Sequence, residues 1–290
     1  MKYGVVFPQT EIGADPAAVR AFAVAAEELG FDHLIAYDHV LGVDASNHPN
    51  WKGFYDYKDM FHEIFVLFGY LAGATTRLGL ATGVLVLPQR QTALVAKQAA
   101  AIDVLSNGRL RLGVGVGWNF VEYEALNEDF SNRGLRSEEQ IEILKKLWTQ
   151  DLVTFKGRWH KITDAGISPL PVQKPIPVWF GGGAEQVLQR IAKMGDGWFI
   201  PGYGELPDAE WKGKYAQLQQ FAKKEGRDIA SIGIEKIVKA SKSHDLLKKQ
   251  ADAWKQAGTT HFSVSTMGQG LKTPDDHIEA IRIFKEAVSG

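Results

Sequence analysis

The sequence predicts an α/β protein, a (β/α)8 TIM barrel with loop insertions, in which eight parallel strands are each followed by a helix. Short apolar segments alternate with amphipathic stretches along the 290 residues and give about eight strand–helix pairs. The apolar segments are continuous rather than alternating, which is typical of parallel strands buried on both faces. The competing fold, an open doubly wound sheet, would carry a glycine-rich fingerprint after its first strand, whereas residues 7–11 read FPQTE.

The first half of the chain supplies four of the predicted pairs. Asp15 and Pro16 are typical of a helix start and Gly30 of a helix end. Gly83 interrupts the third strand, which indicates a bulge. Residues 41–58 are polar and aromatic without periodicity, and we expect a functional loop insertion there. The expected strands cover residues 3–7, 33–38, 78–88 and 110–117, and the expected helices cover 15–30, 61–76, 91–105 and 134–149.

The second half restores the same alternation after one interruption. Residues 152–177 contain four prolines and two glycines, which favour an excursion from the barrel with a short hairpin. The later strands are expected over 178–180, 197–200, 232–240 and 261–265, and the helices over 184–193, 208–225, 244–256 and 274–287. We therefore predict one domain, residues 1–290, with insertions near 41–58 and 152–177.

Composition excludes several classes of function. Lys and Arg number 33 against 34 Asp and Glu, a net charge of −1, so there is no cationic excess for a nucleic-acid partner. The sequence has no Cys, no His-Glu-x-x-His and no paired histidines at metal-ligand spacing, and we expect no metal site. It has no apolar run near ~18 residues and no signal peptide, so we expect a cytoplasmic protein without a membrane partner. No lysine clearly ends a central strand, which disfavours a Schiff base.

Reactive side chains in such a barrel lie at the carboxyl ends of the strands. Asp38 and His39 follow the second strand, and a histidine beside a carboxylate transfers protons near neutral pH. The alternative interpretation, in which Asp38 only caps a turn that His39 satisfies, stays open at this point. Arg90 ends the third strand and either binds an anion or lies in solvent.

Two glycine turns, residues 113–117 and 181–183, follow strands and precede helices. Their backbone N–H groups can approach an anion closely, which favours a ligand with a phosphate. A competing phosphate site with Ser263, Ser265, Gly268 and Gly270 follows the eighth strand. A group of aromatic residues near strand ends could wall a planar ligand, namely Trp51, Phe54, Tyr55, Trp118, Trp198 and Tyr203.

Several of these segments together resemble the bacterial luciferase-like monooxygenase family. They are residues 75–88 (TTRLGLATGVLVLP), 99–117 (AAAIDVLSNGRLRLGVGVG), Arg133-Gly134, the 181–183 glycines and 195–198 (GDGW). The resemblance extends over nearly the whole chain in order. Within the family the sequence is most similar to the branch that uses the deazaflavin coenzyme F420.

The resemblance implies that a flavin-like tricycle binds at the carboxyl-terminal mouth of the barrel. It implies a cis Gly83–Val84 peptide that, with Thr82, backs the ring, and phosphate contacts at the two glycine turns rather than after the eighth strand. The cofactor residues so implied are Thr82, Gly83, Val84, Gly115, Val116, Gly117, Gly181, Gly182 and Gly183. His39 would be the catalytic residue beside the reactive ring carbon, with Asp38 orienting it or fixing its tautomer.

The same resemblance predicts hydride transfer between F420 and a small organic substrate. We expect Trp51, Trp118 and Tyr203 to contact that substrate and the 41–58 loop to close over it. Trp118 replaces a glutamate of sugar-phosphate-oxidising relatives, which disfavours that substrate class. The family also implies a homodimer and a reductase partner that supplies reduced cofactor.

Three alternatives remain beside this prediction. The nearest is an FMN-dependent monooxygenase that uses reduced flavin and dioxygen. The others are a non-catalytic flavin-binding protein and a redox-free barrel lyase that acts on a phosphorylated substrate.

Overall fold

Eight parallel strands close into a barrel in the computed structural model, which describes residues 1–48 and 51–289. Hydrogen-bonded neighbours follow the order β3-β2-β1-β11-β10-β9-β8-β5, and the β3–β5 pairing closes the ring. The barrel strands are β1 (Lys2–Val6), β2 (His33–Ala36), β3 (Gly79–Thr82), β5 (Leu110–Gly115), β8 (Val178–Gly181), β9 (Gly197–Phe199), β10 (Gly233–Lys239) and β11 (His261–Ser265). The predicted (β/α)8 fold is confirmed.

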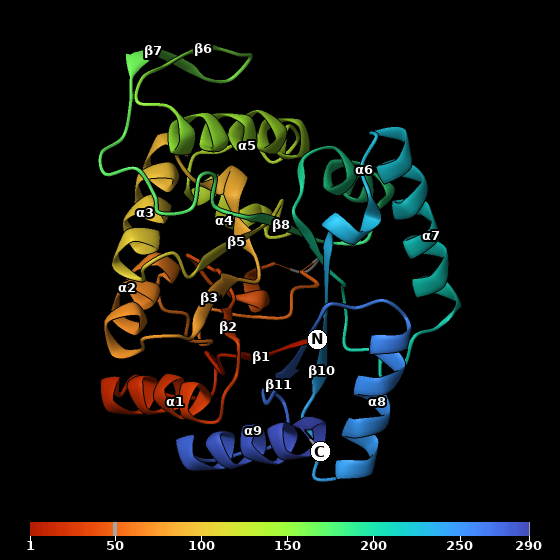
Figure 1. Ribbon diagram of the computed structural model, residues 1–290. Coiled ribbons are helices and arrows are strands. Elements are labelled where there is room, and N and C mark those ends of the chain that lie inside the picture. Colours follow the sequence, from red (N-terminus) through yellow and green to blue (C-terminus); the bar gives the residue numbers. More distant parts are fainter. Residues whose placement is uncertain (49–50, 290) are drawn as a thin grey trace.

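Helices surround this barrel (Figure 1). The eight that follow its strands are α1 (Pro16–Glu28), α2 (Ile64–Ala74), α3 (Thr92–Leu105), α5 (Arg133–Thr149), α6 (Glu185–Met194), α7 (Ala209–Lys224), α8 (His244–Gln256) and α9 (Pro274–Ser289). Asp15 caps α1 by accepting the N–H of Ala17, and Gly30 ends it with φ of +78°, as its sequence predicts. None of the helices of the described residues is long and apolar enough to cross a membrane.

Most predicted boundaries agree with the structure within a few residues, and two regions differ. The second helix begins at Ile64 rather than at residue 61. The short helix α4 (Phe120–Ala125) was not predicted, because six residues are too few to show a helical period. The 41–58 segment contains the 3-10 turn η1 (Ala45–Asn47) and otherwise no regular element among its described residues; residues 49–50 of that prediction lie outside them. Two further 3-10 turns are η2 (Leu87–Gln89) and η3 (Ile229–Ser231).

The predicted hairpin in residues 152–177 is present as β6 (Val153–Lys156) and β7 (Lys161–Ala165), which project beyond α5 (Figure 1). A carboxylate on α5 accepts hydrogen bonds from the turn between β6 and β7. Glu139 accepts the backbone N–H groups of Arg158, Trp159 and His160 and lies 2.7 Å from His160 Nδ1. Gly157 leaves room for this carboxylate, because a Cβ there would lie 2.4 Å from the Glu139 carboxyl carbon.

The third strand is interrupted at the predicted position. A cis peptide joins Gly83 to Val84, and β4 (Leu85–Val86) then resumes pairing with β5. The bulge and the cis Gly83–Val84 bond predicted for this strand are confirmed.

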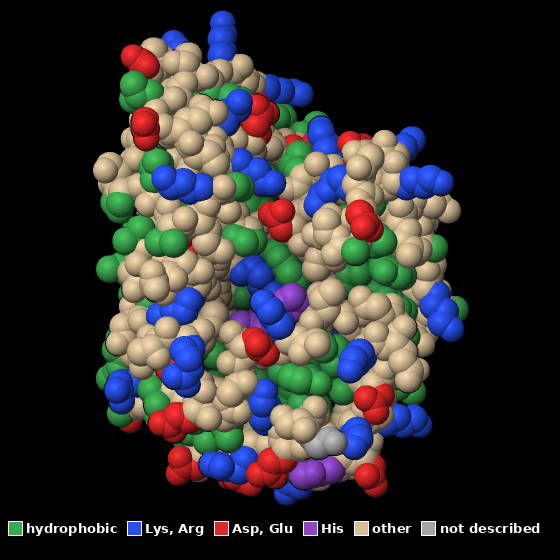
Figure 2. Space-filling model, viewed as in Figure 1, with side chains coloured by type: hydrophobic (Ala, Val, Ile, Leu, Met, Phe, Trp, Pro, Cys, Tyr) green, Lys and Arg blue, Asp and Glu red, His purple; other side chains and the backbone are tan. Residues whose placement is uncertain are grey.

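Charged side chains lie inside the amino-terminal half of the barrel. Glu235 on β10 is 2.6 Å from His33 Nε2 and 2.6 Å from an Arg111 nitrogen, and it also accepts the Ser263 hydroxyl. Arg111 lies 4.2 Å over the Trp179 ring. Burial raises the pKa of Glu235, but the Arg111 charge and the His33 contact outweigh burial and hold it well below its usual value. Figure 2 shows histidine and basic side chains in a hollow at the middle of one face.

Candidate active site

A cavity of about 740 Å³ opens at the carboxyl ends of the strands. This volume lies within the range of ~300–1,000 Å³ that is usual for small-molecule sites. Most of its lining is aromatic, aliphatic or glycine. The residues that line it are Thr10, Glu11, Tyr37, Asp38, His39, Phe54, Tyr55, Asp59, Gly83, Val84, Val86, Gly117, Trp118, Asn119, Glu122, Gly181, Gly182, Phe199, Ile200, Pro201, Gly202, Tyr203, Ile237, Lys239, Met267 and Gly268.

The bulge in the third strand forms part of the cavity wall. Val84 lies against Gly115 and Gly181, where an added Cβ would be 2.5 Å and 2.7 Å from its methyl carbons. These two glycines therefore make room for Val84. Gly115 does not line the cavity itself, and Thr82 lies buried behind the bulge, where its hydroxyl donates to the Gly113 carbonyl at 2.6 Å.

The glycine turns border the cavity at two points. Gly117 (φ +65°) and Gly182 (φ +119°) adopt backbone conformations that favour glycine, and both line the cavity. Val116 and Gly183 do not line it. Gly183 nevertheless stands next to a cation, because its Cβ position lies 2.8 Å from Lys214 Nζ, and α6 begins two residues later.

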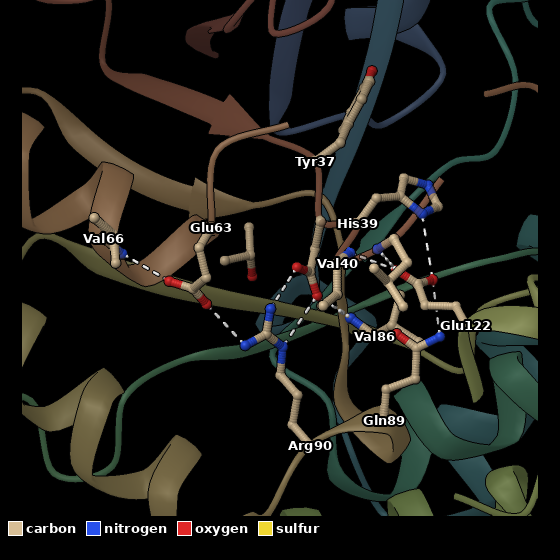
Figure 3. Close-up of polar contacts among 12 residues, drawn as sticks. Tyr37, His39, Val40, Glu63, Val66, Val86, Gln89, Arg90 and Glu122 are labelled. Atoms are coloured by element: carbon tan, nitrogen blue, oxygen red, sulfur yellow. Dashed lines mark hydrogen bonds and ion pairs between the residues drawn. The ribbon is translucent and has the colours of Figure 1, made fainter. Parts of the chain in front are cut away.

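His39 lines the cavity and faces a carboxylate that the sequence interpretation missed. Its Nδ1 lies 3.5 Å from Glu122 Oε2, and the Glu122 side chain is fully buried (Figure 3). Burial raises the pKa of Glu122, but hydrogen bonds from His39, the Val40 and Leu41 backbone and Gln89 lower it below its usual value overall. Glu122 is therefore an anion at neutral pH.

Asp38 has a different partner from the predicted one. Its carboxylate pairs with Arg90 at 2.7 Å and accepts the Val86 N–H at 3.0 Å, while Arg90 also pairs with Glu63 at 2.8 Å (Figure 3). The hypothesis that Asp38 orients His39 is wrong, since among the described residues Asp38 has no hydrogen bond to that ring. Arg90 is neither a solvated loop residue nor a free anion site. Burial lowers its pKa, but the two carboxylates raise it above its usual value.

Aromatic rings from the 41–58 insertion, from its C-terminal flank and from the loop after β5 surround His39. The ring centroids of Tyr55, Phe61 and Trp118 lie 5.3, 4.9 and 5.5 Å from that of His39. Trp118 lines the cavity, as predicted for a substrate contact. Trp51 does not line the cavity; its ring centroid lies 5.2 Å from that of Trp118.

The opposite wall carries Tyr203 and a lysine that was not predicted. The Tyr203 hydroxyl lies 2.9 Å from that of Tyr37, and Lys239 Nζ lies 4.0 Å over the Tyr203 ring while donating to the Met267 carbonyl. Lys239 is the last residue of β10, which corrects the expectation that no lysine ends a central strand. Burial lowers the pKa of Lys239, with Glu11 acting in the opposite direction.

This chain is similar in sequence and in fold to several known proteins. The model of a family described as luciferase-like monooxygenase matches residues 1–286. A protein named F420-dependent glucose-6-phosphate dehydrogenase, from Segniliparus rotundus, is 29% identical over 259 residues, which cover 86% of this chain and 69% of that protein.

Two further proteins match different shares of this chain. An uncharacterised protein of Mycobacterium tuberculosis is 42% identical over 142 residues, so the match spans about half of each chain. The crystal structure of the monooxygenase RslO1 from Streptomyces bottropensis superposes with a TM-score of 0.82 over 100% of this chain and 99% of that one, at 17% identity. At that identity the match establishes the barrel fold alone.

Proposed function

Since the chain belongs to the luciferase-like monooxygenase family and so is an oxidoreductase, we propose that it transfers a hydride between coenzyme F420 and a small organic substrate. The observation that carries this proposal is the placement of His39 and the Val84 bulge in one cavity. The name of the Segniliparus rotundus relative supports F420 as the cofactor.

The cavity residues fit a flat ring with a phosphate-bearing tail. Val84 provides a surface that two glycines keep in place, and a Cβ at Gly117 would lie 2.6 Å from a Val86 methyl, so the turn there admits only glycine. We assign the tail to Gly182 and Gly183, beside the amino terminus of α6 and Lys214. When bound, a 5-deazaflavin supplies a ring carbon that accepts or releases a hydride and reacts poorly with dioxygen.

The protein's own share of the chemistry is proton transfer and exclusion of water. We assign His39 to exchange a proton with the substrate, since imidazole does so near neutral pH and its ring lines the cavity. Asp38 does not touch that ring; it fixes the end of β3–β4 through Val86 and Arg90. The rings of Tyr55 and Trp118 shield His39 from solvent.

We assign Trp118 and Tyr203 as substrate contacts and Trp51 as support for Trp118. The indole of Trp118 occupies the wall beside His39, where it has no acidic group to offer. The proposed substrate is therefore a small organic molecule other than a sugar phosphate.

The test is cofactor titration of the purified protein followed by turnover. F420 fluorescence should quench on binding, FMN should bind more weakly, and His39→Ala should keep F420 affinity within about threefold while losing at least ~10²-fold in kcat. Glu124→Gln, an exposed change on α4, is the matched control and should alter neither quantity. Tight FMN binding with no F420 affinity refutes the proposal.

A second candidate is an FMN-dependent monooxygenase, favoured by the family description. It requires reduced FMN, supplied by a reductase partner, and consumes dioxygen. Oxygen uptake that depends on reduced FMN and on an added substrate would support this candidate over hydride transfer to F420.

We also propose that the chain forms a homodimer through α2 and α3, which pack side by side. Val66, Leu94 and Leu105 on these helices are apolar and 72%, 51% and 70% exposed. Light scattering after gel filtration should give twice the 32.0 kDa chain mass. Val66→Asp should lower the measured mass toward that of one chain. A monomer at all concentrations refutes this interface.

A further inference from the structure

We propose that Glu122 is a positioning residue that accepts the Nδ1–H of His39 and so leaves Nε2 as the nitrogen presented to the substrate. The inference deepens the proposed function and rests on it only for the role of His39 in proton exchange. The state of the His39 ring itself can be measured without cofactor, substrate or turnover.

The surroundings of the Glu122 carboxylate consist of hydrogen-bond donors. Oε1 accepts the backbone N–H groups of Val40 and Leu41, the latter at 3.1 Å, and Oε2 accepts Gln89 Nε2 at 3.0 Å. An ionised carboxylate has only acceptor sites, so the ring nitrogen that faces it at 3.5 Å is stabilised as a donor. Such contacts are often long before substrate binds and shorten in the complex.

The orientation of the ring supports the same assignment. The edges and faces of Tyr55, Phe61 and Trp118 hold the imidazole between them, so rotating it would disturb three aromatic contacts. In this orientation Nδ1 points to Glu122, and Nε2 lies on the other side of the ring (Figure 3). A neutral histidine with its proton on Nδ1 carries its lone pair on Nε2.

Glu122 also fixes the backbone that carries His39. The same carboxylate binds the two residues that follow His39, and Asn119, which caps α4, accepts the Glu122 N–H at 3.1 Å and donates to the Leu41 carbonyl at 3.4 Å. The ring of His39 and the start of the 41–58 insertion therefore share one support. Glu122 acts through His39, and it is the ring of His39 that we assign to proton exchange.

Replacing Glu122 by glutamine makes a sharp test because the amide has both acceptor and donor ends. Its oxygen would take the place of Oε1, facing the N–H groups of Val40 and Leu41. Its NH₂ would then face His39 Nδ1 and Gln89. The buried Gln89 Oε1 has no hydrogen-bond partner within the described part of the chain and can accept this NH₂ after an amide flip. Nδ1 would become an acceptor, and the ring proton would move to Nε2.

The experiment is long-range ¹⁵N–¹H correlation NMR of the cofactor-free full chain with ¹⁵N-labelled histidine, in which His39→Gln assigns the signal. In the wild type the neutral ring should show the Nδ1–H tautomer. Glu122→Gln should reverse it to Nε2–H, and Glu124→Gln should leave it unchanged. With F420 and substrate, Glu122→Gln should lower kcat by about 10²-fold with KM within threefold.

The outcomes separate this inference from the proposed function. An Nε2–H tautomer in the wild type, with the signal assigned by His39→Gln, overturns it, and this reading does not need Glu122→Gln to fold. An unchanged tautomer in folded Glu122→Gln, or the same reversal in Glu124→Gln, also overturns it. Reversal in Glu122→Gln alone, in a protein that shows no F420 turnover, supports the positioning role and refutes the proposed reaction instead.

Discussion

Gly115→Ala tests whether the glycine turn after β5 exists to seat the third-strand bulge. The new Cβ would lie 2.5 Å from Val84 Cγ2 and 3.5 Å from Val84 Cβ, and, its two chain neighbours aside, no other atom of residues 1–48 and 51–289 comes within 4 Å. Because 2.5 Å is far inside van der Waals contact, Val84 has to move. Overpacking of this kind costs about 1–3 kcal/mol. We expect the free energy of unfolding in urea to fall by that amount.

A double-mutant cycle isolates the Val84 contact. Val84→Ala removes the methyl groups that the new Cβ meets, so Gly115→Ala in that background should cost about 1–2 kcal/mol less than in the wild type. Because Gly115 does not line the cavity, any loss of F420 affinity in the single variant, expected near tenfold, acts through a displaced Val84.

The matched control is Gly73→Ala, a glycine in α2 with open space around its Cβ position. Alanine has the higher helix propensity, so this variant should be more stable by about 0.5–1 kcal/mol. The reasoning fails if Gly115→Ala changes stability by less than ~0.5 kcal/mol, or if its cost is the same beside Val84 and beside alanine.

Three further predictions concern ionisable side chains. Arg90→Ala leaves the buried Asp38 carboxylate unpaired and should cost about 3–5 kcal/mol in urea unfolding, and a cost below 1 kcal/mol would contradict the ion-pair assignment. Burial lowers the pKa of His33 and lowers that of His261 to about 3. Between roughly pH 6 and 4 the unfolded chain then binds a proton at His261 that the folded chain does not, so stability should fall as the pH falls, by up to about 1.4 kcal/mol per pH unit from His261. The lowered pKa of His33 acts in the same direction. His261→Gln should flatten that slope, and an unchanged slope would show that His261 does not contribute. Glu139→Ala removes the acceptor of three backbone N–H groups and should make the β6–β7 turn the first site of limited proteolysis, with wild-type-like cleavage as the contrary result.

The repeating features of the fold could be predicted from the sequence, and the contacts around His39 could not. Continuous apolar strands and well-marked helix ends predicted the barrel, and Gly83 predicted the bulge. Asp38 was paired with His39 only because the two are adjacent, yet successive side chains of an extended segment point to opposite sides. Asp38 accordingly reaches Arg90, and His39 reaches Glu122, which is 83 residues further along the chain.

Glu122 and Lys239 had faint signals in the sequence. Glu122 stands three residues after Asn119, a good capping residue that follows the glycine turn, and this spacing marks a short helix at the mouth of the barrel. Lys239 is the last residue of a mostly apolar strand, a position where a charged side chain is unusual. Trp51 shows the converse, because aromatic composition reveals that rings cluster but not which ring faces the cavity.

The stacking of Arg111 on Trp179, with Phe199 beside it, has a kinetic consequence. Phe199 lines the cavity, and the Arg111–Glu235 ion pair lies behind it in the barrel interior, so these side chains form a floor between the cavity and the opposite end of the barrel. Ligands then enter and leave the cavity through the mouth at the carboxyl ends of the strands. If the cofactor of the proposed reaction lies against Val84, deeper than the substrate, it binds first and leaves last, and the reaction follows a compulsory order.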